Sequence, residues 1–402
     1  MLYRLFGEEQ LKLLKGELEE YVDRIRVLED VELDWRPLPG EVETKKAYAV
    51  DGSRKSRRFS GLIAYSTSAF AYGSGPSKRL VYSNLLTANE DFEDELFRLQ
   101  MSGLEARMCA IIGSLYEPEL LFMDGTLSGA LIRPPTFPRA ENRYEELKGK
   151  IGEERIMALI EEHLNDLEEH HEELLNEAAG KEELSTVKDK PVVLSDGALF
   201  RGEFDREVRK GLHIIFNYVE YKFAHEKMLE TVSPVYIAKT QYSRSLSKSE
   251  KLDVPDTVLI DGWIALHNAE ETGYIVSPTP KPTKAPSFTS KLMEAFPKHF
   301  PKLKEIYERG INYAYVRLAP GEPLYLLEFT GEIDKKLIGK VLYHSADVGY
   351  PVPLIRAHHG VKITEKLFSR ELNALTNRLA EEWELEYRLL KALFAYGRSP
   401  LG

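Results

Sequence analysis

Three strand-like segments follow one another early in the chain, and a helix and a fourth strand come directly after them. KKAYAV at 45–50, GLIAYSTSAFAYG and RLVYSNLL are rich in β-branched and aromatic residues. A helix is predicted from about Asp91 to Leu115, where apolar residues recur at helical spacing and acidic residues fill the first turns. ELLFMDGTLSG then has the composition of a strand. This β-β-β-α-β order predicts an α/β fold.

An acidic segment between Glu141 and Glu183 dominates the charge of the chain. Its net charge is −10, whereas that of the whole chain is −11. Its apolar residues recur at helical spacing, which predicts one long exposed helix or a helical pair, inserted at about 139–190. Because the rest of the chain is nearly neutral, a local basic groove for nucleic acid is compatible with the overall charge.

Composition excludes several classes of site. The chain has one cysteine, Cys109, which rules out an internal disulfide and a cysteine-rich zinc or iron–sulfur site. No stretch approaches about 18 uncharged apolar residues and there is no apolar leader, so we expect a cytoplasmic protein with no membrane partner. The motif G-x-x-x-x-G-K-[ST] is missing, so an ATP-driven motor must come from a partner.

Other patterns extend the expected α/β alternation. Amphipathic helices are predicted at about 8–29 and 365–396. PVVLSDGALF at 191–200, PVYIAKTQYS, AYVRL and LYLLEFTG predict strands, and VLIDGWIAL fits either a strand or a short helix. The Pro-rich stretch SPTPKPTKAPS at 277–287 predicts a loop.

Two aspartates each end a predicted strand and precede a glycine. They are Asp51 in YAVDGSR and Asp124 in LLFMDGTLSG. A carboxylate in this position lies at the edge of the sheet's core, and the glycine allows another group to approach the backbone closely. The alternative is a plain turn, because Asp-Gly is common in turns and the pair recurs at Asp196 and Asp261.

Glu105 is a third candidate carboxylate, on the predicted helix between the two strands. It shares a helix face with Cys109 and Ile112, at the edge of the apolar stripe. A carboxylate there is costly to desolvate unless a cation meets it. The alternative is a rim residue that is solvated or paired with Arg98 or Arg107.

Together, Asp51, Glu105 and Asp124 suit a divalent-ion site of oxygen ligands. Mg²⁺ and Mn²⁺ accept such ligands and keep positions open for water and phosphate. Two ions held by a shared carboxylate activate the attacking water and stabilise the leaving oxygen of a phosphodiester. These residue types therefore indicate phosphodiester hydrolysis.

A basic run directly after Asp51 is the candidate for binding the DNA phosphates. Positive charge is needed there because a cluster of acids repels DNA. The alternative is a solvated loop with no binding role. The basic residues of the run are Arg54, Lys55, Arg57 and Arg58.

The segment SADVGYPVPLIRAHHG supplies two further candidates. Pro353 fits the opening turn of a helix, which places His358 four residues after Leu354. A lone histidine on an apolar face is usually a core residue, and this is the alternative for His358, although Mn²⁺ accepts an imidazole readily. Tyr350 is placed either to stack on a base or to pack in the core.

The sequence resembles the NurA nucleases of archaea and some bacteria. The resemblance rests on AVDGSR, the helix that bears Glu105, FMDGTL, PVYIAKTQYS and VGYPVPLIRAH, in that order over roughly 45–360. It implies a homodimer with an RNase H-like core, a mixed sheet flanked by helices. It also implies a Mn²⁺-dependent nuclease, with probably two ions per site and Mg²⁺ as the other candidate ion.

The resemblance also implies roles for particular residues. Asp51, Glu105 and Asp124 correspond to metal ligands, His358 to a further ligand or catalytic group, and Tyr350 to a site residue. Lys239, at the end of a predicted strand, is expected near the phosphate as a DNA-binding residue, and Asp347 is left undecided.

The expected function is DNA end resection at double-strand breaks with a hexameric HerA-type translocase. Family members degrade single- and double-stranded DNA 5′ to 3′ and also cut single strands internally. We divide the chain into a helical segment (1–44), a nuclease domain (45–370) and a C-terminal helix (371–402). Two alternatives stay open: a non-catalytic DNA clamp or adaptor for a translocase, and an RNase H-like nuclease for RNA or junctions.

Overall fold

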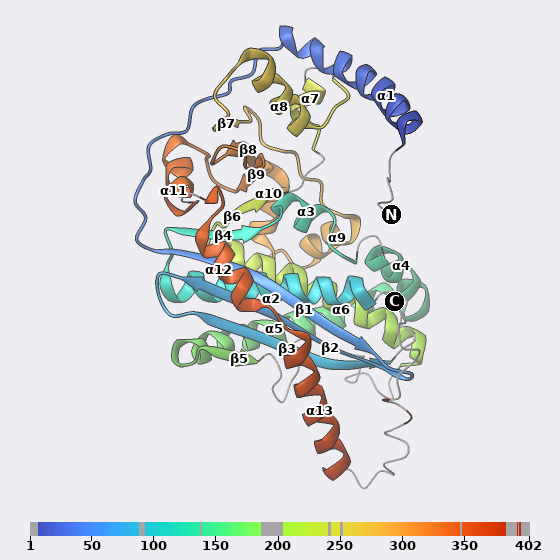
Figure 1. Cartoon of the computed structure of the whole chain (residues 1–402). Helices are drawn as coiled ribbons and strands as arrows, with labels where there is room; N and C mark the ends of the chain where they lie inside the picture. Colours follow the sequence, from blue (N-terminus) through green and yellow to red (C-terminus); the bar gives the residue numbers. More distant parts are fainter. Residues whose placement is uncertain are drawn as a thin grey trace.

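The computed structural model describes residues 7–87, 93–136, 139–185, 204–239, 243–249, 252–345, 348–382, 392 and 394. The described strands form one nine-stranded sheet with the order β5-β3-β2-β1-β4-β6-β9-β8-β7 (Figure 1). The strands are β1 (Ala47–Arg58), β2 (Leu62–Gly73), β3 (Lys78–Thr87), β4 (Leu120–Asp124), β5 (Glu183–Ser185), β6 (Val235–Ala238), β7 (Gly273–Val276), β8 (Asn312–Arg317) and β9 (Tyr325–Phe329).

Helices cover both faces of the sheet. The helices are α1 (Glu8–Arg26), the 3-10 helix η1 (Val27–Asp30), α2 (Glu93–Tyr116), α3 (Leu127–Ile132), α4 (Arg139–Ile151), α5 (Glu153–Gly180), α6 (Arg206–Thr231), α7 (Ser245–Ser249), α8 (Asp256–His267), α9 (Ser287–Ala295), α10 (Pro301–Arg309), α11 (Lys335–Ser345), α12 (Val352–Val361) and α13 (Glu365–Glu382).

The predicted β-β-β-α-β order is confirmed. β1 pairs antiparallel with β2, β2 pairs antiparallel with β3, and β1 pairs parallel with β4. In the parallel pair Val50 lies opposite Met123, so the aspartates that follow them come to the same edge of the sheet core. The topology therefore places the two Asp-Gly pairs side by side.

The Asp-Gly pairs have different local structures. Asp51 does not begin a turn: β1 continues past it, with Asp51 opposite Phe70 and Arg57 opposite Ala64 in the antiparallel ladder. Asp124 does end its strand, and Gly125 follows with φ of +92°, a conformation that favours glycine. Asp261 lies inside helix α8, and Asp196 lies outside the described residues.

Helices α2 and α6 pack on one face of the sheet and bury its main core. The acidic segment forms the predicted helical pair, α4 and α5, but the expectation of an exposed insertion is wrong. Its apolar residues are fully buried against α6 and α2 because the helix is amphipathic, with the acids on the opposite side. The fully buried ones include Ile156, Ile160, Leu164, Leu167 and Leu174.

Helix α12 lies across the other face, over β1 and β2 (Figure 1). Its buried residues, Leu354 and Ala357 among them, join a second apolar cluster with Ala49 of β1 and Phe122 of β4. This packing brings a segment near residue 358 onto the strand that bears Asp51. Helix α13 continues from α12 and extends beyond the sheet in the view of Figure 1.

Several smaller predictions have clear outcomes. VLIDGWIAL is helical, as α8, and the Pro-rich stretch is a loop up to the start of α9. Strands β5 and β7 were not predicted, and the strand predicted at 191–200 lies outside the described residues. No helix within the described ranges is long and apolar enough to span a bilayer. The division of the chain at residues 44 and 370 stays a prediction.

Candidate active site

Asp51 lies where β1 passes from the buried core to the sheet edge. Its side chain is 12% exposed, and one carboxylate oxygen accepts a 2.7 Å hydrogen bond from His358 Nδ1. The other oxygen accepts from the backbone N–H of Gly52 at 2.8 Å. Burial raises the pKa of Asp51, and the bond from His358 partly opposes this rise.

Gly52 brings Glu105 against the strand. Helix α2 crosses β1 here, and a Cβ atom on Gly52 would overlap the Glu105 carboxylate. Burial, reinforced by the charges of Asp51 and Asp124, raises the pKa of Glu105 to about 8. The alternative that Glu105 pairs with Arg107 is wrong, because Arg107 pairs with Glu220 at 2.9 Å.

Asp124 completes the acidic group from the end of β4. Its side chain is exposed, and Oδ1 accepts a 3.0 Å hydrogen bond from the Tyr350 hydroxyl. The ring of Tyr350 is buried, and both burial and the Asp124 charge raise the pKa of its hydroxyl. Tyr350 therefore packs in the core and also holds Asp124, whereas its stacking on a base stays a prediction.

Helix α12 places His358. Pro353 stands in its first turn, as the sequence predicted, and Pro351 directly precedes the helix. Leu354 is buried, whereas the His358 side chain is 69% exposed and points to Asp51 rather than into the core. The interpretation of His358 as a core residue is therefore wrong.

The site residues surround a hollow of about 130 Å³. Lys239 lies at its rim, with Nζ 4.2 Å from the centre of the Tyr350 ring. Glu105 stands behind Asp51, close enough for the Asp51 charge to raise the pKa of Glu105. The hollow is lined by Asp51, Asp124, Lys239, Tyr350, Leu354, Ile355 and His358.

The donor set suits a divalent ion of the Mn²⁺ type. It offers three carboxylates and one imidazole, and no salt bridge to Lys or Arg is recorded for Asp51, Glu105 or Asp124 in the described part of the chain. Among the described residues, however, no group of three His, Cys, Asp or Glu side chains is already arranged to hold a metal ion. Asp51 and His358 bond to each other, so metal binding requires these side chains to turn toward a shared ion.

The predicted basic run is not a loop but the outer half of β1. Because side chains alternate along a strand, the run divides between the two faces of the sheet. Arg54 and Arg58 pair with acids at the start of α2, and Lys55 and Arg57 both pair with Glu365 of α13. Their role in binding DNA stays a prediction.

The contacts that hold α12 in place were not predicted. Gly360 rests on the Phe70 ring, where a Cβ atom would overlap it, and Arg79 donates to the Gly360 carbonyl at 2.5 Å. Ser53 accepts from the backbone N–H of Ile363 at 3.1 Å. No periodicity marks these residues, because the pairing joins segments about 300 residues apart. Asp347, which the sequence left undecided, lies outside the described residues.

Comparison with known proteins identifies the family. The profile of the NurA domain matches residues 45–363. The chain belongs to the NurA family. A NurA from Pyrococcus furiosus, named a DNA double-strand break repair nuclease, is 30% identical over 98% of both chains. An uncharacterized protein of Methanocaldococcus jannaschii is 26% identical, covering 92% of this chain and 91% of that one.

Solved NurA structures share the fold. A crystal structure of NurA has a TM-score of 0.76 at 26% identity, covering 96% of this chain and 99% of that chain. A structure of NurA bound to dAMP and manganese has a TM-score of 0.75 at 28% identity, covering 95% and 98%. The expected RNase H-like core, a mixed sheet flanked by helices, is thereby confirmed.

Proposed function

We propose that this NurA-family nuclease, a metal-dependent phosphodiester hydrolase, cuts DNA at a Mn²⁺ site formed by Asp51, Glu105, Asp124 and His358. The observation that carries the proposal is the convergence of carboxylates from β1, α2 and β4 with an imidazole from α12. Two relatives support the proposal. They are the repair nuclease of P. furiosus and the NurA whose structure contains dAMP and manganese.

The side chains of the proposed site have different roles. A bound Mn²⁺ supplies Lewis-acid chemistry, activating water and stabilising the leaving oxygen, and the three carboxylates with His358 are the groups to hold it. The Tyr350 hydroxyl fixes one oxygen of Asp124 and leaves the other free. Before an ion binds, Nδ1 of His358 is bonded to Asp51 and Nε2 remains available for a proton.

Lys239 is the phosphate contact at the rim of the hollow. Its ammonium stands over the Tyr350 ring, which orients it without neutralising it. A cation in this place offsets the repulsion between the acids and an incoming DNA strand. Arg54, Lys55, Arg57 and Arg58 contribute if DNA displaces their present acidic partners.

The finer parts of the proposal come from the family resemblance. They are two ions per site, with Mg²⁺ as the other candidate ion, and 5′-to-3′ degradation of single- and double-stranded DNA with internal cutting of single strands. They also include a homodimer and a HerA-type translocase as partner. With these properties, the protein would act in the cytoplasm in the resection of double-strand-break ends.

The direct test is DNA degradation by the purified protein with Mn²⁺, with and without a chelator. We expect Asp51→Asn and Asp124→Asn to abolish Mn²⁺-dependent cleavage. Asp253→Asn, which changes an exposed carboxylate paired only with Arg244 among the described residues, is the control and should cut like the wild type. Equal cleavage by all four proteins would favour the adaptor alternative, and preferential cleavage of RNA or junctions would favour the other alternative.

A further inference from the structure

The short helix α3 follows directly on the turn that carries Asp124. It has only six residues, from Leu127 to Ile132, and a helix of this length does not form by itself in water. Thr126 caps its first turn by accepting from the Gly129 N–H at 3.2 Å. Its other stabilising contacts come from elements far along the chain.

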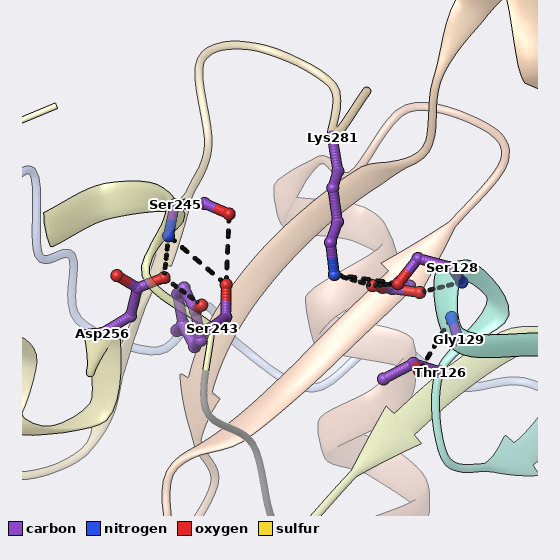
Figure 2. A network of polar contacts seen from close by, with 9 residues as sticks. Thr126, Ser128, Gly129, Ser243, Ser245, Asp256 and Lys281 are labelled. Carbon is purple, nitrogen blue, oxygen red and sulfur yellow. Dashed lines mark hydrogen bonds and ion pairs between the residues drawn. The ribbon is translucent and has the colours of Figure 1, made fainter. Parts of the chain in front are cut away.

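A buried carboxylate holds the start of α3. Glu328 of β9 is fully buried, and its Oε2 accepts from the backbone N–H of Ser128 at 2.7 Å. Its Oε1 accepts from the Ser128 hydroxyl at 2.6 Å and from Lys281 at 3.1 Å. Lys281 also donates to the Ser128 hydroxyl, and Figure 2 shows it reaching down to Ser128 beside Thr126 and Gly129. A negative charge at this end matches the helix dipole.

The buried amine of Lys222, whose pKa burial lowers to about 7, holds the other end of α3. Lys222 of α6 is fully buried and donates to the Leu131 carbonyl at 2.8 Å. The Tyr307 hydroxyl donates to the same carbonyl at 2.8 Å, and that of Tyr221 donates to the Ala130 carbonyl at 2.9 Å. The start of this helix therefore faces a carboxylate, and its last carbonyl groups accept hydrogen bonds from the side chains of Lys222, Tyr307 and Tyr221.

Such an arrangement costs free energy, because the buried Glu328 carboxylate loses its hydration. It fixes the turn from Asp124 to Ser128, since Gly125 is bonded to Ile237 of β6 on one side and Ser128 to Glu328 on the other. We propose that Glu328 is a positioning residue: by holding Ser128, it sets the direction of Asp124 and so the affinity of the site for Mn²⁺. This inference rests on the proposed function.

The chain offers a matched control. Asp256 is also fully buried and holds a short helix, α7, by accepting from the backbone N–H groups of Ser245 and Ser247 at 2.8 and 2.9 Å. It further accepts from the Tyr315 hydroxyl at 2.6 Å. Figure 2 shows both networks, and α7 leads to none of the proposed ligands. The Asp256→Asn variant therefore measures how much a buried carboxylate that holds a short helix contributes to stability, apart from any effect on the site.

The test compares Ser128→Ala and Glu328→Gln with Asp256→Asn and the wild type. Thermal unfolding gives stability, and calorimetric titration with Mn²⁺, supported by the Mn²⁺ resonance spectrum, gives affinity without turnover. We expect all three variants to unfold at lower temperature. Ser128→Ala and Glu328→Gln should raise the Kd for Mn²⁺ about 10-fold or more, whereas Asp256→Asn stays within about two-fold of the wild type.

Each outcome either supports or overturns the positioning role of Glu328. If Glu328→Gln does not fold, Ser128→Ala decides, because it removes the hydroxyl that bonds both Glu328 and Lys281 while keeping that ion pair. Wild-type affinity in the folded Ser128→Ala protein, or equal weakening by Asp256→Asn, overturns the positioning role. A wild type that binds Mn²⁺ while the variants match it overturns this role alone; a wild type that binds no Mn²⁺ overturns the proposed function as well.

Discussion

At the scale of single residues, the closest packing in the site is between Gly52 and Glu105. Hydrogen is the only side chain that leaves room there, because a Cβ atom would overlap the carboxylate. The position of the Glu105 carboxylate therefore depends on a residue that has no functional group of its own. This explains why the glycine stands inside a strand, where it otherwise weakens the structure.

Gly52→Ala should displace Glu105 and reduce Mn²⁺-dependent cleavage about 100-fold, since a misplacement of about 1 Å has an effect of this size. The measurement is the cleavage rate of a DNA end at saturating Mn²⁺. Gly149→Ala is the control, because Gly149 lies within α4 and a Cβ atom there meets nothing within 4 Å. Unchanged cleavage by Gly52→Ala would contradict the role given to Glu105.

Tyr350→Phe tests the bond to Asp124. Removing the hydroxyl frees the carboxylate to rotate, and loss of such an outer partner typically lowers metal affinity or activity 10- to 100-fold. We expect that loss in cleavage, with the fold intact because the ring still packs against Tyr325. Tyr343→Phe, at a partly exposed position on α11, should cut like the wild type. Equal activity in the two variants would leave Tyr350 with a packing role only.

At the scale of elements, the succession of the first three strands, the helix with Glu105 and the fourth strand could be predicted because each element repeats a local period. The continuation of β1 past Asp51 and the burial of the apolar side of α5 could not be predicted from the sequence. The ladder with β2 carries β1 beyond Asp51, and this depends on a partner strand rather than on the Asp-Gly pair itself. The apolar side of α5 is buried because α6 covers it, which periodicity alone does not specify.

The helical layer should weaken in acid. Burial lowers the pKa of His163, His171 and His225 to about 3 and that of His213 to about 4, against an ordinary 6.5. A histidine whose pKa is depressed on folding stabilises the protein above pH 6.5, and this stability is lost as the pH falls toward the folded-state value.

We therefore expect these histidines to lower the free energy of unfolding between pH 6.5 and about 4 through proton uptake on unfolding, against the opposite effect of Glu220 and Glu226, whose pKa burial raises. Denaturant titrations across this range measure the slope, and His213→Gln should reduce the uptake by up to one proton. His267→Gln, at an exposed position on α8, is the control and should leave the slope unchanged. The same slope in both variants would contradict neutral burial of His213.

At the scale of the whole molecule, the separation of charge decides how a net charge of −11 is compatible with DNA. The acidic excess lies on α4 and α5, which pack against α6, whereas the candidate site opens where β4 ends beside β1 and α12. The sequence predicted this separation from the position of the acidic segment. It did not predict that Glu365 of α13 would meet Lys55 and Arg57, because that contact joins distant segments.

Lys239→Met should weaken DNA binding to a similar degree for all sequences, since a phosphate contact carries no sequence information. Binding to single-stranded DNA, measured over a range of salt concentrations with Ca²⁺ in place of Mn²⁺, should show a slope lowered by about one charge. Lys336→Met, on α11, is the control. An unchanged slope in Lys239→Met would remove Lys239 from the DNA path.

The most direct test of the account is a crystal structure of this protein grown with Mn²⁺, with the ion located by its anomalous scattering. The account predicts a peak in the hollow beside Tyr350, within coordination distance of Asp51, Glu105, Asp124 and His358. It also predicts that the hydrogen bond between His358 and Asp51 gives way to that ion. A manganese peak elsewhere, or none in the hollow with that hydrogen bond intact, would contradict it.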